Sequence, residues 1–342
     1  MGVNLKDLLI RKEVEVDYFQ YKTLAVDAFN NLYQYISTIR QRDGTPLMDS
    51  DGNTTSHLSG LFFRTMNLMQ KNIKFIFVFD GKAPELKKQE RERRRSLKQE
   101  AKKQYDIAKQ SKDVESMKKY AARTSILTTQ MIDESKELLK AMGVPTVQAP
   151  SEGEAQAAFL VSKGEAFASV SQDYDSLLSG VPKLVQNLNV SKKKKTLYGY
   201  QTIKPEILNL TDNLNNLGID LDQLIVLAIL VGTDYNVGGV KGIGPKKALL
   251  LVKKHSKDFE EVFKQVKWNE YFDFGWKEVF KTIREMPTTT DYSIEQGDIN
   301  PEAINKILVD KHGFSKDRIN KVLKSFDKLK QGKQQKGLGE FI

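Results

Sequence analysis

Five consecutive apolar residues, Phe75-Ile76-Phe77-Val78-Phe79, run directly into an acidic residue, Asp80. A short, continuously apolar run of this kind is typical of a strand that is buried on both faces of a parallel sheet. Two other runs in the first half of the chain have the same layout, and helical sequence separates all three. They predict an α/β fold with a central, mostly parallel twisted sheet flanked by helices. The two further runs are residues 23–26, which precede Asp27, and residues 167–171, which precede Asp173 and Asp175.

Acidic residues follow each of the three predicted strands. Ligands of open α/β sheets bind beyond the carboxyl ends of the strands, so we expect these aspartates to share one crevice. A single aspartate after a strand is also a common turn or helix-cap residue, and the interpretation therefore depends on the joint pattern. A fourth segment, Ser151-Glu152-Gly153-Glu154, fits two interpretations. Ser151 and Glu154 have the spacing of a helix capping box, or Glu154 joins the aspartates.

The composition limits the chemistry of such a crevice. The 342 residues include no cysteine, which excludes disulfides, iron–sulfur clusters, thiolate zinc sites and a cysteine nucleophile. The three histidines, His57, His255 and His312, are far apart and none lies in an H-E-x-x-H motif, which argues against histidine-based metal or triad chemistry. Carboxylate ligands remain, and they select hard cations such as Mg²⁺, Mn²⁺ or Ca²⁺.

Basic residues outnumber acidic residues by 54 to 44, and most of the surplus lies in residues 82–112, with twelve Lys or Arg and five acids. This stretch predicts a largely solvated helix. It is either an ordinary exposed helix with i,i+4 ion pairs or a path for a polyanion such as nucleic acid. No apolar run approaches the ~20 residues of a membrane span, and we expect a cytosolic or nucleoid-associated protein without a membrane partner.

A glycine-rich segment, residues 238–247 (GGVKGIGPKK), follows an apolar helix predicted over residues 221–231. Pro245 suits the first position of a second helix. Exposed amides at that helix start, beside Lys246 and Lys247, predict a phosphate cradle. The spacing is not that of a P-loop, and an ordinary glycine-rich turn between two helices is the alternative.

The C-terminal tail combines two kinds of composition. Residues 328–334 predict disorder, yet the last eight residues, 335–342 (QKGLGEFI), include three large apolar side chains. Such a terminus is either a docking peptide or a segment that packs back onto the domain.

Taken together, these segments resemble the flap structure-specific endonucleases of the XPG nuclease family, in their archaeal form. The resemblance covers essentially the whole chain and implies a PIN-like nuclease core with a helical arch and a helix–two-turn–helix DNA-binding element. It is carried by AVDAFNNLYQY (25–35), VFDGKAPELK (78–87), QAPSEGEAQAA (148–158), SQDYDSLL (171–178), LVGTDYNVGGVKGIGPKKALLL (230–251) and QKGLGEFI (335–342). The implied regions are an N-terminal nuclease region (1–98), an arch or cap (99–130), an internal nuclease region (116–258) that includes the helix–two-turn–helix at about 226–254, a C-terminal helical region (259–333) and a clamp-interacting tail (334–342).

The resemblance also implies catalytic and metal-binding residues. Seven carboxylates would hold two Mg²⁺ ions directly or through water, and Mn²⁺ would be able to replace them. Clustered carboxylates repel one another unless cations compensate their charge. Lys87 and Arg94 would contact the scissile phosphodiester from the base of the arch and, with Asp175, form the catalytic group. The seven carboxylates are Asp27, Asp80, Glu152, Glu154, Asp173, Asp175 and Asp234.

DNA contacts follow from the same resemblance. Tyr33 would stack on a base near the cleavage site. The glycine-rich segment would grip duplex backbone and, as in relatives, bind K⁺ through backbone carbonyls. Ala122 precedes Arg123 where relatives often carry two basic residues, so the arch cap is expected to hold a flap less firmly. The expected DNA-binding residues are Tyr33, Arg40, Lys87, Arg94, Arg123, Glu152, Gly232, Asp234, Gly242, Gly244, Lys246 and Lys247.

The tail resembles a peptide that binds the sliding clamp PCNA, through Gln335, Leu338, Phe341 and Ile342. Two departures from the family weaken or qualify this expectation. The last residue is isoleucine rather than an aromatic, and no long basic extension follows, as it does in eukaryotic relatives. The expected setting is therefore an archaeal-type cell.

The implied function is a structure-specific 5′-flap endonuclease with 5′→3′ exonuclease activity. It would hydrolyse a phosphodiester near the junction of single- and double-stranded DNA and leave a ligatable nick in lagging-strand maturation and repair, as a cytoplasmic monomer. Three alternatives stay open. They are a related exonuclease or junction-cutting nuclease, a non-catalytic DNA-binding clamp adaptor, and a Mg²⁺-dependent phosphatase on the same kind of sheet.

Overall fold

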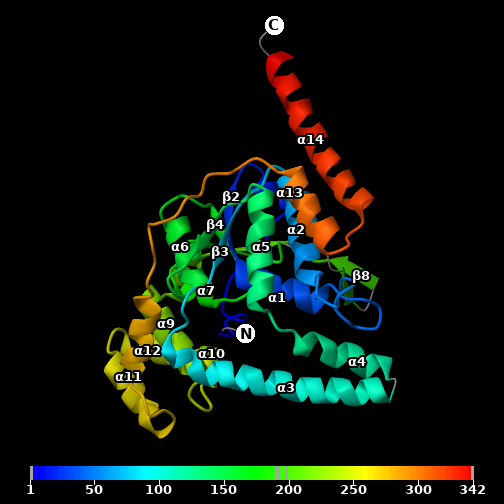
Figure 1. Ribbon diagram of the computed structural model, residues 1–342. Coiled ribbons are helices and arrows are strands. Elements are labelled where there is room, and N and C mark those ends of the chain that lie inside the picture. Colours follow the sequence, from blue (N-terminus) through cyan, green and yellow to red (C-terminus); the bar gives the residue numbers. More distant parts are fainter. Residues whose placement is uncertain (1–2, 112, 189–192, 197–198, 340–342) are drawn as a thin grey trace.

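The computed structural model describes residues 3–111, 113–188, 193–196 and 199–339 (Figure 1). A seven-stranded sheet forms its centre, with strand order β1-β9-β6-β5-β2-β3-β4. The five strands from β6 to β4 are parallel, while β9 is antiparallel to β6 and β1 is antiparallel to β9. The strands are β1 (Lys12–Glu13), β2 (Thr23–Asp27), β3 (Lys74–Phe79), β4 (Thr146–Gln148), β5 (Ala168–Val170), β6 (Lys183–Gln186) and β9 (Glu206–Asn209).

The three predicted strands are the adjacent central strands β5, β2 and β3, which confirms the fold class expected from the apolar runs. A separate two-stranded sheet pairs β7 (Lys193–Thr196) with β8 (Gly199–Thr202). Parallel neighbours need crossover connections, and helices supply them on both faces of the sheet.

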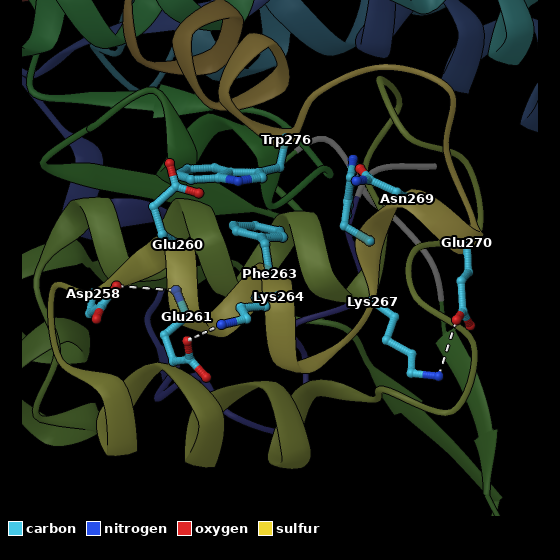
Figure 2. Close-up of a pocket in the computed structure, with 10 residues that line it drawn as sticks. Asp258, Glu260, Glu261, Phe263, Lys264, Lys267, Asn269, Glu270 and Trp276 are labelled. Atoms are coloured by element: carbon cyan, nitrogen blue, oxygen red, sulfur yellow. Dashed lines mark hydrogen bonds and ion pairs between the residues drawn. The ribbon is translucent and has the colours of Figure 1, made fainter.

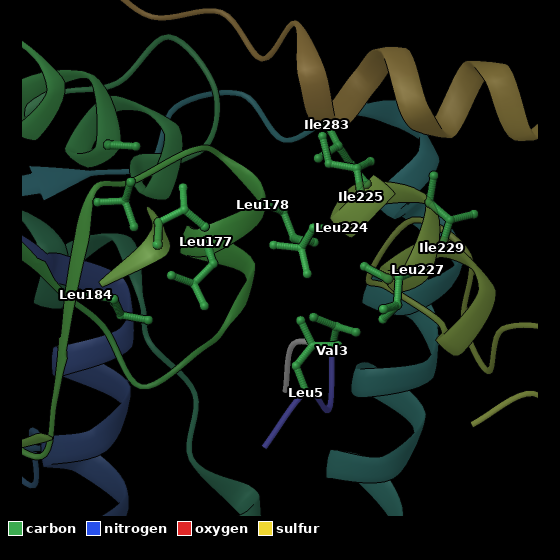
Figure 3. Close-up of a cluster of buried hydrophobic side chains, with 14 of the residues drawn as sticks. Val3, Leu5, Leu177, Leu178, Leu184, Leu224, Ile225, Leu227, Ile229 and Ile283 are labelled. Carbon is green, nitrogen blue, oxygen red and sulfur yellow. The ribbon is translucent and has the colours of Figure 1, made fainter. Parts of the chain in front are cut away.

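Side chains along β2 and β3 alternate between two hydrophobic clusters, because successive residues of a strand point to opposite faces. Ala25, Ile76 and Val78 belong to the α9-side cluster, together with most of helix α9 (Leu221–Val231). Val26 and Phe77 belong to the α1-side cluster. Figure 3 shows part of the α9-side cluster, where leucines of α7 (Asp175–Leu178) face leucines and isoleucines of α9.

Different helices cover the two faces (Figure 1). The α9-side face carries α6, α7, α9 and α10, and the α1-side face carries α1, α2, α5 and α13. The bounds are α1 (Ala28–Thr38), α2 (Ser56–Met69), α5 (Thr129–Ala141), α6 (Gly153–Ser162), α8 (Leu210–Leu217), α10 (Pro245–His255) and α13 (Pro301–Asn305).

The basic stretch forms a helical hairpin that leaves the body of the molecule. It consists of η2 (Glu85–Lys87), α3 (Lys88–Gln110), α4 (Val114–Ala121) and η3 (Ala122–Thr124). In Figure 1, α3 runs beneath the body with α4 alongside it. The buried residues of α3 are Glu90, Ala101 and Ala108. The rest of α3 is open to solvent or partly covered, as the sequence predicts for a solvated helix.

The glycine-rich segment joins α9 to α10, and Pro245 occupies the first turn of α10, as predicted. Gly232 has φ +112°, and a Cβ on Gly239 would lie 2.3 Å from the carbonyl of Val231. The turn therefore needs glycine at both positions. Beyond α10 follow α11 (Phe259–Gln265), η4 (Trp268–Glu270) and α12 (Trp276–Arg284).

The C-terminal region crosses back to the other face through η5 (Lys306–Lys311) and ends in α14 (Lys316–Gly339), which projects from the body (Figure 1). Disorder was expected over residues 328–334, and this expectation was wrong, because α14 continues through them. Lysine, glutamine and leucine are good helix formers, and they override the low hydrophobicity.

No single helix among the described residues is long and apolar enough to cross a membrane. The pair α8 and α9 meets that length and composition test only when taken together across a 78° bend. Eight of the eleven residues of α9 are buried inside the protein.

Candidate active site

The seven predicted carboxylates all lie at the carboxyl ends of the central strands or on the segments packed over them. Asp27 ends β2 and Asp80 follows β3. Glu152 and Glu154 stand at the start of α6, whose backbone N–H at Gly153 donates to Oδ1 of Asp80 at 2.7 Å. The remaining three are Asp173 and Asp175, after β5, and Asp234, after α9.

The pleat of the sheet explains why the strand-end acids meet. Asp27 follows Val26, which faces the α1-side cluster, so the alternation directs Asp27 to the opposite face, with Ala25. On the neighbouring strand Ala25 pairs with Ser169, and two residues later Ser171 donates to Oδ2 of Asp27 at 3.3 Å. Small residues on this face leave room for α6.

Electrostatic coupling connects all seven carboxylates. Burial, together with the nearby charges of Asp80 and Asp173, raises the pKa of Asp27 to about 8. Burial and Glu152 raise the pKa of Asp80 to about 6. Such shifts are typical of uncompensated acids that share one site.

The same coupling extends to the other side of the site. Burial, together with repulsion from Asp234 and Asp173, raises the pKa of Asp175 to about 6. The pKa of Glu154 is raised by burial and then by Asp175, Asp27 and Asp173. The site therefore carries more negative charge than its surroundings neutralise.

Two cations at the base of the arch face these acids. Lys87 pairs with Glu152 and lies 3.6 Å from Oδ2 of Asp234. Arg94 donates from Nη2 to both oxygens of Asp234, at 2.8 and 2.7 Å. Burial alone would lower the pKa of Lys87, but Tyr235, Glu152 and Asp234 together raise it above its usual value.

Sequence reasoning missed Glu90, which is 3% exposed and accepts bonds from Arg93 and Arg94. The signal available was its spacing of four from Arg94 along the helix. Two further missed residues are Asn30 and Ser171, which contact Asp27 and Asp173. No spacing rule marks the bonds from Asn30 to Asp173 and from Ser171 to Asp27, because in each case the partner lies at the end of another strand or beyond it.

The donor set fits hard divalent cations, because it consists of buried and half-buried carboxylates, Asp27 and Asp175 among them with raised pKa values, and contains no sulfur or imidazole. In the described part of the chain, no three Asp, Glu or His side chains already surround one point that could hold a metal ion. Lys87 and Arg94 instead provide the positive charge beside Glu152 and Asp234.

The capping-box interpretation of Ser151 and Glu154 was wrong. The N-cap of α6 is Glu152, and no side chain caps it. Ser151 instead donates to the carbonyl of Lys82 at 2.9 Å. It thereby helps to hold the segment after β3 against the segment after β4, where Gly81 also donates to the carbonyl of Ser151 at 2.6 Å. Glu154 is left to face the aspartates.

A pocket of about 550 Å³ opens between α1, α3 and the base of the arch, with Arg94 in its wall. Its walls combine the exposed ring of Tyr33, the apolar side chain of Ile126 and five Lys or Arg side chains. Nζ of Lys98 lies 4.8 Å from the centre of the Tyr33 ring. This combination suits a single strand of nucleic acid. The lining residues are Tyr33, Arg91, Arg94, Arg95, Lys98, Gln99, Lys102, Thr124 and Ile126.

Not every predicted DNA contact points outward. The guanidinium of Arg40 makes its hydrogen bonds within the protein. It donates to the carbonyls of Ser37 and Gly44 and to the hydroxyl of Ser125. Arg123 is exposed in η3. At the helix–two-turn–helix, Gly242, Gly244, Lys246 and Lys247 are exposed, whereas Gly232 is half-buried.

A larger pocket of about 720 Å³ lies away from the carboxylates, between α11, η4 and α12 (Figure 2). Trp276 stacks on Phe263 in its wall, with ring centres 4.4 Å apart, among side chains of both charges. It contains none of the predicted site residues.

The predicted clamp-binding residues are only partly described. Gln335 and Leu338 lie within α14, and only the backbone is described there. Phe341 and Ile342 lie outside the described residues. Their role stays a prediction.

Comparison with known proteins places this geometry in a family. Two family models match the chain, the XPG N-terminal domain over residues 1–101 and the XPG I-region over residues 143–234. Flap endonuclease 1 of Pyrococcus abyssi is 49% identical over 338 residues, covering 98% of this chain and 96% of that protein. Flap endonuclease 1 of Pyrococcus furiosus is 48% identical over 338 residues, covering 98% and 97%.

Solved structures agree with these sequence matches. Flap endonuclease-1 from Methanococcus jannaschii has a TM-score of 0.77 at 39% identity, covering 97% of this chain and 100% of that one. The catalytic core of Rad2 in complex with a DNA substrate has a TM-score of 0.69 at 22% identity, covering 95% and 100%, and shares the fold. Because the two family models span more than half of the chain and the archaeal relatives align over nearly all of it, the protein belongs to the XPG nuclease family.

Proposed function

We propose that this chain, a metal-dependent DNA nuclease of the XPG family, cuts single-stranded 5′ flaps where they leave duplex DNA. The observation that carries the proposal is the meeting of seven acids with Lys87 and Arg94, at the point where the basic arch leaves the sheet. A binding protein gains nothing from buried acids beside a phosphate backbone. A hydrolase needs them to concentrate cations.

The two cations are proposed to bind the scissile phosphate. Lys87 and Arg94 lie seven residues apart, on η2 and the first turns of α3, so both point to the same side. In the reaction they would leave their carboxylate partners and stabilise charge on the phosphate oxygens. Glu90 would keep the Arg94 guanidinium in place, because it accepts a hydrogen bond from Nε at 2.6 Å. Nη2 would then be able to exchange its bond to Asp234 for a bond to the phosphate.

The seven carboxylates are proposed to hold two Mg²⁺ ions, with Mn²⁺ as a substitute. When bound, a pair of such ions lowers the pKa of an attacking water and neutralises charge on the phosphate and the leaving oxygen. Within the site, Asp175 is kept in position by the backbone N–H of Val3, which donates to its Oδ1 at 2.9 Å.

Recognition is proposed to depend on DNA shape and phosphates. Tyr33 and the basic pocket would receive the single strand, and Arg123 would contact it from η3. The glycine-rich segment, with Gly242, Gly244, Lys246 and Lys247, would hold the duplex, and K⁺ would bind the backbone carbonyls there. Arg40 would act through the loop that it braces, because its own N–H groups already have partners.

The biological setting is proposed from the tail and the relatives. Residues 335–342 would bind the sliding clamp PCNA, and the protein would act as a cytoplasmic monomer at the replication fork. The expected product is a nick ready for ligation, in lagging-strand maturation and in repair.

One experiment tests the activity. Labelled 5′-flap, single-stranded, bubble and nicked duplex substrates are incubated with the protein in Mg²⁺ or in chelator, with Asp175→Asn as the inactive control. Preferred cutting of the flap near its junction in Mg²⁺ supports the proposal. Equal cutting of all four substrates would point to the related exonuclease, and no cutting in Mg²⁺ would point to the non-catalytic adaptor.

A further inference from the structure

Asn30 lies in the first turn of α1 and contacts two of the predicted metal-binding segments. Its backbone N–H donates to Oδ1 of Asp27 at 2.9 Å. Its side-chain Nδ2 donates to Oδ2 of Asp173 at 2.9 Å, and its Oδ1 accepts a bond from the backbone N–H of Gln172 at 3.2 Å. One residue therefore holds the acid at the end of β2 and both the backbone and the acid of the segment after β5.

Ser171 makes a second bridge between the same two acids. Its hydroxyl donates to Oδ2 of Asp27 at 3.3 Å and accepts a bond from the backbone N–H of Asp173 at 3.3 Å. Ser171 is fully buried, at the position beyond the β5 strand where the pleat faces Asp27. Asp27 and Asp173, which are remote in sequence, are thus connected by two short paths of hydrogen bonds.

The chemistry of these bridging groups suits a site that must stay negative. An amide and a hydroxyl orient a carboxylate without cancelling its charge, whereas Lys87 and Arg94 neutralise Glu152 and Asp234. The Asn30 amide also opposes the repulsion between the carboxylates of Asp27 and Asp173, because it donates a hydrogen bond to Asp173. Asp173 lies in the segment after β5, where the like charges of its carboxylate and that of Asp27 repel each other.

We propose that Asn30 is a positioning residue that fixes the Asp173 carboxylate against Asp27, so that the pair is preorganised for a divalent cation. This inference rests on the proposed function, because it takes these acids as metal ligands. Groups that orient ligands from behind typically affect metal affinity by 10–100-fold.

The test measures Mn²⁺ binding to the full-length, DNA-free protein by titration of free Mn²⁺, followed by its electron paramagnetic resonance signal. Asn30→Leu keeps the side-chain size and removes both side-chain hydrogen bonds. We expect it to weaken Mn²⁺ binding by roughly 10–100-fold. Gln34→Leu, one turn further along α1, is the matched control and should bind like the wild type.

A second measurement separates positioning from folding. The urea midpoint of Asn30→Leu in chelator should equal that of the wild type, while Mn²⁺ should raise the variant's midpoint less. A lowered midpoint in chelator together with wild-type Mn²⁺ affinity would show a purely structural role and overturn the proposal. If Asn30→Leu does not fold, Asn30→Ser, which suits the first turn of a helix, takes its place.

The outcomes also separate this inference from the proposed function. If the wild type binds no Mn²⁺, the proposed metal site, and with it the proposed function, is contradicted. If the wild type binds Mn²⁺ and the Asn30 variant binds it equally well, only the positioning role fails.

Discussion

Both carboxylate oxygens of Asp234 accept hydrogen bonds from the same nitrogen of Arg94, at 2.8 and 2.7 Å. The pair joins the segment after α9 to the base of the arch, across 140 positions of sequence. Glu90 binds the same guanidinium through Nε at 2.6 Å. The root of the arch is therefore tied to the candidate active site by the residue that we propose to contact the phosphate.

Arg94→Ala is expected to slow single-turnover flap cleavage by about 10²–10³-fold, the usual effect of removing one group that stabilises transition-state charge. Arg94→Lys should recover little of the lost cleavage rate, because a lysine cannot reproduce the planar, forked donor geometry of arginine. Quenched-flow cleavage at saturating protein measures this. Lys109→Ala, at the far end of α3, is the control, and an Arg94→Ala rate within threefold of the wild type would contradict the assignment.

Asp175→Ala is expected to abolish cleavage while flap affinity changes little. The acid lies among six others, so its removal lowers repulsion toward DNA even as it removes a metal ligand. Fluorescence anisotropy in Ca²⁺ measures the affinity, and gel assays in Mg²⁺ measure the rate. Asp175→Asn, which still accepts the bond from Val3, should behave in the same way. Retained turnover in either variant would remove Asp175 from the proposed ligands.

Gly153→Ala tests the contact between α6 and Asp80. A Cβ at this position would lie 2.6 Å from Oδ1 of Asp80, so the carboxylate or the helix start must move. We expect at least a tenfold higher Mg²⁺ concentration for half-maximal cleavage. Overall stability should change by less than about 1 kcal/mol, since alanine is the better helix former. Gly275→Ala, where a Cβ meets nothing within 4 Å, is the matched control. An unchanged Mg²⁺ dependence would show that the site tolerates this displacement.

A buried cluster away from the active site predicts how stability depends on pH. Glu134 lies 3.5 Å from Nε2 of His57 and 3.4 Å from Nε2 of His312, and His312 also contacts Asp49 at 2.9 Å. Burial would raise the pKa of Glu134, but bonds from His57, Gln130 and Lys311 lower it to about 2. The bond from His312 is the main cause that lowers the pKa of Asp49 to about 2. Burial lowers the pKa of His57.

All three shifts have the same sign. The histidine contributes stability that is present above its unfolded pKa of about 6.5 and is lost as the pH falls below it. The carboxylates contribute stability that is present above about pH 4 and is lost as the pH falls toward 2. The contribution of this cluster to the free energy of unfolding should therefore decrease on acidification from pH 7.

Glu134→Gln should cost about 3 kcal/mol at pH 7, the usual effect of breaking a buried ion pair, and the difference from the wild type should narrow below pH 4. Urea denaturation at several pH values measures it. Glu137→Gln, on the exposed side of the same helix, is the control. A pH-independent difference would show that Glu134 acts by packing rather than by charge.

Deletion of residues 335–342 should remove stimulation by a sliding clamp and leave basal flap cleavage intact. The deletion begins within α14, a helix that projects from the body of the protein (Figure 1), so it should not disturb the active site. Cleavage assays with and without PCNA measure both quantities. A fall in basal cleavage would instead favour a tail that packs onto the domain.

The sequence predicted the central strands and the acids that follow them because both depend on local patterns. An apolar run specifies a buried strand, and parallel neighbours bring their carboxyl ends to one edge. The roles of Asn30 and Ser171 toward the other strand could not be predicted in this way, whereas the pairing of Glu90 with Arg94 follows from their spacing along the helix. The roles of Asn30 and Ser171 depend on which strand lies beside which and on where a helix crosses them, and a polar residue in a helix or strand has no signature of its partner. The sequence likewise could not predict that the Arg40 side chain turns toward Ser125, a residue remote from it in the chain.

The alternation of side chains along β2 and β3 sets a constraint on how this protein tolerates change. Ala25, Ile76 and Val78 face one cluster, and the acids at the strand ends continue that face. Insertion or deletion of a single residue within either strand would turn its aspartate toward the opposite cluster without altering the identity of any side chain. Insertion or deletion of one residue should therefore be as damaging as the loss of the acid. This applies between Thr23 and Asp27 and between Lys74 and Asp80. The strand length there is as much a part of the active site as the carboxylates themselves.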